Sequence, residues 1–149
     1  MKRLTALLCA AVLCLLCACG GTSRPFSTDL VDEILESKTF SEPLEPLDRE
    51  IACFIYQLDP EQSNLTDLKA YRSSGATCEE VAVLIFETED DASAAMSSLE
   101  SYLAARLEDC RDYMPDQAVK LENATLAQHT NTVLLLVPGN WMAAEEFTP

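Results

Sequence analysis

Val81-Ala82-Val83-Leu84-Ile85-Phe86 decides the fold together with a second run, Val133-Leu134-Leu135-Leu136-Val137, because both are apolar at every position. Short apolar runs of this length are typical of buried β-strands. A strand without apolar/polar alternation is usually covered on both of its faces. The two runs therefore predict two central strands that lie side by side in one sheet, with helices packed on that sheet.

Two further segments are expected to pair outside the central strands. Residues 66–72 alternate between apolar and polar side chains, which predicts a half-buried edge strand. Residues 121–128 are predicted to form the other outer strand, joined to 132–137 through the turn His129-Thr130-Asn131. If the chain reverses direction at each connection, the result is a four-stranded antiparallel sheet with the strand order 1-2-4-3.

Residues 47–58 fit two kinds of structure. The run 51–56 is apolar enough for a buried strand, but the apolar residues of the whole segment recur at helical spacing, so we predict a helix. Cys53 would then point away from the apolar face. That predicted face consists of Leu47, Ile51, Phe54, Ile55 and Leu58.

Three other helices complete the prediction. Ser27 is expected to cap a first helix that ends near residue 37. Thr88, with Asp91 three residues later, predicts a capping box at the start of the longest helix, on whose apolar stripe Cys110 would be a buried thiol. Asn140 is expected to cap a short last helix over residues 141–147. The element order α-α-β-β-α-β-β-α belongs to the α+β class.

The N-terminus predicts export and a lipid anchor. Lys2 and Arg3 precede an apolar run over residues 4–18, which is too short to span a membrane but typical of a secretory signal peptide. The run ends in Leu16-Cys17-Ala18-Cys19, which resembles a bacterial lipobox. The resemblance implies cleavage before Cys19 and attachment of a diacylglyceryl group to its sulfur. An ordinary signal peptide with an incidental cysteine is the alternative.

The predicted organisation is therefore a signal peptide over residues 1–18, a lipidated cysteine with a short tether over 19–26, and a single α+β domain over 27–149. Two long acyl chains make an anchor that does not readily dissociate. Seven residues reach at most about 25 Å when extended, so the domain would stay close to the bilayer. We expect the protein at the cell membrane, on its extracytoplasmic side, with the lipid bilayer as its partner through acylated Cys19.

Charge limits the possible partners. The formal net charge is −15 for the whole chain, and it becomes −17 when Lys2 and Arg3 leave with the signal peptide. Such a surface repels nucleic acid, so a nucleic-acid role is not expected. The simplest explanation of the negative charge is that it keeps the protein soluble. The more specific explanation is that the protein binds a basic or cation-rich partner.

The cysteines leave several possibilities open. Besides Cys19, the mature chain would contain Cys53, Cys78 and Cys110, any two of which are free to form a disulfide outside the cytoplasm. None stands at CxxC spacing and His129 is the only histidine, so we predict no metal site and no cofactor. The acidic loop 59–64 lacks the glycine that a calcium loop needs at its sharp turn.

The most distinctive stretch of the chain is Tyr71-Arg72-Ser73-Ser74-Gly75-Ala76-Thr77-Cys78-Glu79-Glu80-Val81-Ala82-Val83. It resembles the signature of an uncharacterised lipoprotein family of Gram-positive, clostridia-like bacteria that is defined by one domain of unknown function, and the likeness spans roughly residues 28–138. Asp112-Tyr113-Met114-Pro115 and Lys120-Leu121-Glu122-Asn123-Ala124 follow in the expected order, and Tyr56-Gln57-Leu58-Asp59 is similar to a Tyr-Gly-Ile-Asp-like motif that ends a helix. Because the family has no assigned activity, the resemblance implies a fold and a location only.

Two residues depart from the family pattern. Cys78 stands where a small residue is expected, and Gln57 stands where a glycine is expected. Both departures argue against a shared chemistry that uses the cysteines.

No catalytic set is recognisable, so we predict that the protein is not an enzyme. A thiol-active enzyme that uses Cys53 or Cys78 is the least favoured alternative. The segment 71–77 is the most distinctive local group, because an aromatic, a cation and hydroxyls there could hold a small anionic or peptide ligand; a turn that only sets strand register is the plainer explanation. Candidate ligand-binding residues are Tyr71, Arg72, Ser73, Ser74 and Thr77, with Trp141 as a docking anchor or a residue packed on the sheet edge.

The function expected from these observations is a non-catalytic binding or interaction module that acts at the outer face of the membrane, with an envelope protein as a possible partner. The alternative is a lipoprotein that binds a small ligand or a metal ion and serves a transporter.

Overall fold

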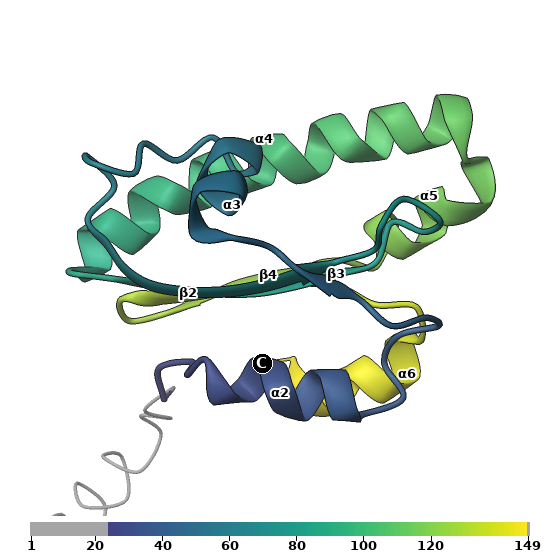
Figure 1. Ribbon diagram of the computed structural model, residues 1–149, viewed down its shortest axis with the longest axis horizontal. Helices are drawn as coiled ribbons and strands as arrows, with labels where there is room; N and C mark the ends of the chain where they lie inside the picture. The colour runs from purple at the N-terminus through teal and green to yellow at the C-terminus, as the bar shows by residue number, and fades with distance from the viewer. Residues whose placement is uncertain (1–23, 149) are drawn as a thin grey trace, which may run out of the picture.

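A computed structural model describes residues 24–148. One five-stranded antiparallel sheet, in the order β1-β2-β3-β5-β4, forms the centre of the molecule. Helices α3, α4 and α5 cover one face of the sheet, and α2 and α6 cover the other (Figure 1). The α+β class is confirmed. The strands are β1 (Glu45–Pro46), β2 (Leu65–Arg72), β3 (Glu80–Phe86), β4 (Thr125–His129) and β5 (Thr132–Val137).

The predicted order of the four longer strands is correct, but the prediction of a four-stranded sheet is wrong. The fifth strand, β1, pairs with the outer edge of β2 through Glu45 opposite Arg72 and Pro46 opposite Tyr71. Two residues are too few to show a periodicity in the sequence. Proline lacks an N–H group and is found in sheets mainly at edges, which agrees with the place of Pro46.

Within residues 24–148, five α-helices flank the sheet. They are α2 (Asp29–Glu36), α3 (Arg49–Ile55), α4 (Glu89–Tyr113), α5 (Pro115–Glu122) and α6 (Trp141–Ala144), with a 3-10 turn (Glu145–Phe147) after the last. The capping box at Thr88 and Asp91 is confirmed, as is the cap that Asn140 provides for α6. The predicted cap at Ser27 is wrong, because Thr28 occupies that position and its side chain makes no capping hydrogen bond. No helix in residues 24–148 is long and apolar enough to cross a membrane.

The two central strands divide the core into two layers. Ala82, Leu84 and Phe86 of β3 face the layer under α3, α4 and α5. Val81 and Val83 of the same strand face the layer under α2 and α6. All five side chains are buried, as are those of β5, so the expectation that both strands are covered on both faces is confirmed.

The predicted strand over residues 121–128 begins too early. Residues 115–122 form α5 instead, with Pro115 at its first turn, where a missing N–H group costs nothing. Ala118 and Leu121 are buried at a spacing of three, which fits one face of a helix. The strand β4 starts only at Thr125.

Helix α3 forms where a helix was expected, but its buried face is not the predicted one. Phe54 is 86% exposed and Ile51 is 49% exposed, whereas Cys53 is 1% exposed. Tyr56, directly after the helix, is fully buried and lies edge-on to Tyr102 of α4 at 5.3 Å between ring centroids. The orientation of α3 thus buries the Tyr56 phenol and leaves Phe54 in solvent.

Candidate functional site

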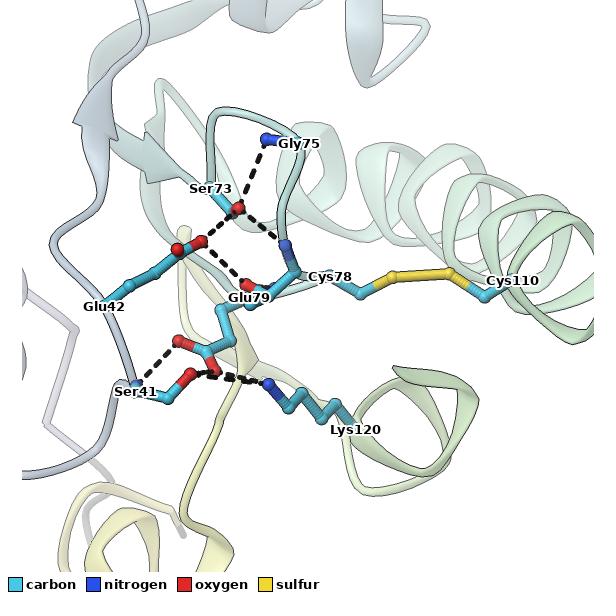
Figure 2. Close-up of polar contacts among 9 residues, drawn as sticks. Ser41, Glu42, Ser73, Gly75, Cys78, Glu79, Cys110 and Lys120 are labelled. Atoms are coloured by element: carbon cyan, nitrogen blue, oxygen red, sulfur yellow. Dashed lines mark hydrogen bonds and ion pairs between the residues drawn. A yellow bond between two sulfur atoms is a disulfide. The ribbon is translucent and has the colours of Figure 1, made fainter. Parts of the chain in front are cut away.

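Three consecutive residues, Cys78, Glu79 and Glu80, lead into β3 and bind different parts of the fold. All three are almost completely buried, with exposed fractions of 1%, 0% and 0%. We call this segment the junction. Figure 2 shows Cys78 and Glu79 with their partners, together with the turn that precedes them.

Cys78 forms a disulfide with Cys110 near the end of α4. Of the three pairings that the sequence left open, this is the one present. Cys110 is buried as predicted, but its sulfur is in the disulfide and is not a thiol. The bond closes a loop of 32 residues and ties the C-terminal part of the longest helix to the start of the central strand.

Cys53 is the remaining free cysteine of the described chain, and it is buried rather than exposed as expected. Burial raises the pKa of its thiol, and the nearby charge of Arg49 only partly opposes that effect. A buried thiol with a raised pKa is a poor nucleophile because the thiolate is the reactive form. The arrangement does not favour the thiol-active enzyme.

Glu80, the first residue of β3, accepts hydrogen bonds from two residues of α4 and from Tyr56, the residue after α3. Tyr56 donates to Oε1 at 2.8 Å, Tyr102 of α4 donates to Oε2 at 2.7 Å, and Arg106 forms an ion pair with Oε2 at 2.5 Å. Burial and then the charge of Glu80 raise the pKa of the Tyr56 and Tyr102 phenols. The carboxylate is thus fully paired, as a buried charge requires.

Glu79 binds on the other side of the junction. Lys120 of α5 forms an ion pair with its Oε1 at 2.6 Å, and Ser41 donates both its backbone N–H, at 2.8 Å, and its hydroxyl (Figure 2). Burial alone would raise the pKa of Glu79, but the hydrogen bonds from Lys120 and Ser41 outweigh it and lower the pKa. A Cβ at Gly139 would collide with this carboxylate, so the position needs glycine.

The turn before the junction is held by Glu42. Ser73 and Thr77 both donate their hydroxyls to Glu42 Oε1, and Ser73 Oγ accepts from the N–H groups of Gly75 and Thr77 (Figure 2). Two of the candidate ligand-binding residues therefore use their hydroxyls to fix the turn, as the plainer explanation expected.

The structure brings some of the candidate residues together and separates others. Arg72, Ser73 and Thr77 line an open hollow of about 190 Å³ between the turn and α4, and Ser74 lines an adjoining one. Tyr71 packs against the opposite core layer, on the side of α2. Trp141 lies at the start of α6, is 54% exposed and does not line either hollow.

Sequence analysis missed the α4 side of this hollow, which is formed by Arg106, Asp109, Tyr113 and Met114 beside the disulfide. A signal was present in the sequence, because Tyr102, Arg106 and Cys110 recur at a spacing of four and so share one helix face. A tyrosine, an arginine and a cysteine at that spacing predict that one face of α4 carries polar side chains.

His129 does not belong to this region. Its ring stacks on Phe26 at 4.4 Å between centroids, and Nδ1 lies 3.1 Å from the carbonyl oxygen of Arg24. Within residues 24–148, no three His, Cys, Asp or Glu side chains are placed to hold a metal ion together.

A family profile, described as a domain of unknown function (DUF4358), matches residues 40–138. The chain belongs to the DUF4358 family. The matched DUF4358 region contains all five strands, the junction and the hollow, whereas α2 and α6 lie outside it. Neither a curated protein nor a solved structure matches the chain.

The DUF4358 match confirms the expected resemblance as far as a domain of unknown function is concerned. A bacterial source and a lipoprotein of clostridia-like organisms remain predictions. The predicted signal peptide over residues 1–18, Cys19 and most of the predicted tether lie outside the described residues.

Proposed function

We propose that the protein is a lipid-anchored extracytoplasmic lipoprotein, and that its DUF4358 domain is a non-catalytic module that binds an envelope protein at the outer face of the cell membrane. The proposed anchor is Cys19, which the tether joins to the start of the described chain at Arg24. The acidic surface of the chain gives no support to a nucleic-acid partner.

The disulfide between Cys78 and Cys110 is the observation that most supports this location. Disulfides persist in oxidising compartments outside the cytoplasm and are rare in cytosolic proteins. The bond therefore agrees with the export signal predicted for residues 1–18, and the two observations come from different parts of the chain.

Helix α3 offers a surface suited to a protein partner. Ile51 and Phe54 are exposed by 49% and 86%, and their spacing of three places them on the same helix face. Apolar side chains that are exposed next to one another mark interaction sites more often than single ones do. We place the partner-binding surface at these two residues.

A purification from membranes in mild detergent tests both parts of the proposal. The full-length protein should bring down a stoichiometric partner, and Cys19→Ala should leave the membrane fraction. Phe54→Ser should lose the partner while the protein stays anchored. The matched control is Met142→Ser on α6, which removes an equally apolar side chain, 65% exposed, from the other side of the sheet.

Two results would count against the proposal. If Cys19→Ala remained as firmly bound to membranes as the natural chain, the lipid anchor would be wrong. If Phe54→Ser and Met142→Ser retained the same partner equally well, the binding surface would not lie on α3.

A further inference from the structure

The hollow beside the junction is flanked by two arginines that lie on the same side of the sheet. Arg72 is the last residue of β2 and stands opposite Glu80 in the strand register, so both side chains share the face that α4 covers. Arg106 reaches Glu80 from α4. Both arginines line the hollow, together with Tyr113 and Met114.

Much of the hydrogen-bonding capacity of the two guanidinium groups is unused. A guanidinium carries five N–H donors. Arg106 uses only Nη1, which contacts Glu80 and the Tyr102 hydroxyl. The side chain of Arg72 makes no hydrogen bond or ion pair with any residue in 24–148, although Glu45 on β1 and Glu80 on β3 stand opposite it in the register. Glu80 accepts from three donors, and Arg72 is not one of them.

The disulfide limits how far the two elements that carry the arginines can move apart. Arg106 and Cys110 are four residues apart and so lie on one face of α4, one turn from each other. Cys110 is bonded to Cys78, which the turn at 73–77 joins to Arg72. The turn itself is held by Glu42. The disulfide and the turn thus hold both arginines beside the hollow before any ligand binds. This reduces the conformational entropy that would be lost on binding.

We infer that this hollow is a binding site for a carboxylate that carries an apolar group, with Arg72 and Arg106 as the residues that hold the carboxylate. Planar guanidinium groups pair with carboxylates through two parallel hydrogen bonds. Tyr113, which is 83% exposed, and Met114, which is 36% exposed, give an apolar surface to the rest of the ligand. Asp109 also lines the hollow and disfavours ligands with several negative charges.

This inference deepens the binding role proposed above but does not depend on the lipid anchor. The same chemistry occurs in a free small carboxylate and in the C-terminus of a peptide. The inference gives Arg72 a role in ligand binding. Ser73 and Thr77 differ from Arg72 because their hydroxyls donate hydrogen bonds to Glu42.

The test is a calorimetric titration of the full-length protein in detergent with N-acetyl-leucine, which has a carboxylate and an apolar side chain. N-acetyl-leucinamide, which lacks the carboxylate, is the matched ligand, and inorganic phosphate is the competing anion. We expect saturable binding of N-acetyl-leucine alone. Binding of the amide with equal affinity, equal binding of phosphate, or no binding of N-acetyl-leucine would each overturn the inference.

Single substitutions test whether the ligand binds in this hollow. Arg72→Gln should weaken binding of N-acetyl-leucine by about tenfold or more, because a charge-assisted hydrogen bond is lost. Glu45→Gln should tighten it, because the negative charge opposite Arg72, which repels the ligand carboxylate, is removed. Arg111→Gln, whose guanidinium pairs with Glu122 outside the hollow, is the control and should change nothing. Equal affinities for Arg72→Gln and Arg111→Gln would contradict the assignment.

One further comparison distinguishes a free small carboxylate from the C-terminus of a peptide. A tetrapeptide with a free C-terminal leucine that binds more tightly than N-acetyl-leucine would assign the site to a peptide C-terminus, and equal affinities would assign it to a free small carboxylate. Because neither Cys19 nor Phe54 lines the hollow, failure of these titrations would leave the proposed anchor and the proposed α3 surface unaffected. Loss of the partner in the membrane purification would likewise leave the carboxylate site standing.

Discussion

Cys110 on α4 is bonded to Cys78, two residues before β3, so the longest helix and the central strand are covalently joined at one end. Around this bond, Glu79 and Glu80 each bind a cation and at least one hydroxyl from other elements. Among residues 24–148, both buried carboxylates thus lie at the end of the sheet where the carboxylate site is proposed.

Removal of the disulfide should reduce stability substantially. For a loop of 32 residues the entropy lost from the unfolded chain corresponds to roughly 3–4 kcal/mol. We expect Cys78→Ser with Cys110→Ser to lower the free energy of unfolding by about that amount in urea. The natural chain treated with a reductant should unfold at the same urea concentration as the double variant. A double variant as stable as the oxidised chain would contradict the role given to this bond.

Replacement of Glu79 should change how stability depends on pH. Its pKa is lowered in the folded state, so the ionised carboxylate contributes stability at pH values above the unfolded pKa of about 4.3, and this contribution is lost as the pH falls through the folded pKa. Glu79→Gln leaves the Lys120 ammonium, whose side chain is 16% exposed, without its partner, and we expect a loss of about 3 kcal/mol at pH 7 that shrinks towards pH 3.

The control for Glu79 is Glu122→Gln, which breaks an exposed ion pair with Arg111 and should change stability by less than about 1 kcal/mol. Urea unfolding of both variants between pH 3 and pH 7 gives the comparison. Parallel curves for Glu79→Gln and the natural chain over this range would be inconsistent with a stabilising ion pair at Lys120.

Alkali should unfold the protein through its buried tyrosines. Burial and the charge of Glu80 raise the folded-state pKa of Tyr56 and Tyr102, so their contribution to stability is complete below the unfolded pKa of about 10 and declines as the pH rises above it. Phenolate absorbance from these two side chains should therefore appear together with unfolding. In Tyr56→Phe that part of the absorbance change should be smaller, and the lost hydrogen bond to Glu80 should cost about 1–3 kcal/mol.

Gln57 occupies a position that favours glycine. It follows the C-cap of α3 with φ of 57°, and the hydrogen bonds from Gln57 N to Phe54 O and from Leu58 N to Cys53 O form a Schellman motif. Gln57→Gly should raise the free energy of unfolding by roughly 1 kcal/mol, because glycine adopts this conformation without steric cost. Gln57→Ala keeps the steric cost and should give no such gain. Equal stabilities for the two variants would rule out this explanation.

Sequence reasoning predicted most of the fold because the decisive signals were local. The composition of the apolar runs that form β3 and β5 is enough to predict that they are buried. Thr88 and Asp91 predict the start of a helix from a stretch of four residues. The glycine expected at Gln57 by family resemblance agrees with the positive φ found there. These features need no knowledge of the rest of the chain.

The errors arose where distant contacts decide the outcome. α3 buries Cys53 and leaves Phe54 in solvent because Tyr56 must reach Tyr102 and Glu80, which lie far away in sequence. The pairing of Cys78 with Cys110 and the approach of Arg106 to the turn likewise depend on how α4 lies over the sheet. The half of the candidate site on residues 72–77 was therefore recognised from the sequence. The half on α4 left only a spacing signal, and its approach to the turn is a long-range contact that local patterns do not show.

The central claim is that this domain acts outside the cytoplasm on a lipid anchor, and the intact mass of the full-length protein tests it most directly. The protein is extracted from the membranes of a bacterial host without reductant, unfolded and alkylated before the mass is taken. The account predicts a chain that begins at a diacylglyceryl-modified Cys19 and takes up one alkyl group, at Cys53, because Cys78 and Cys110 are bonded to each other. An unlipidated chain that retains residues 1–18 and is alkylated at Cys53, Cys78 and Cys110 alike would contradict it.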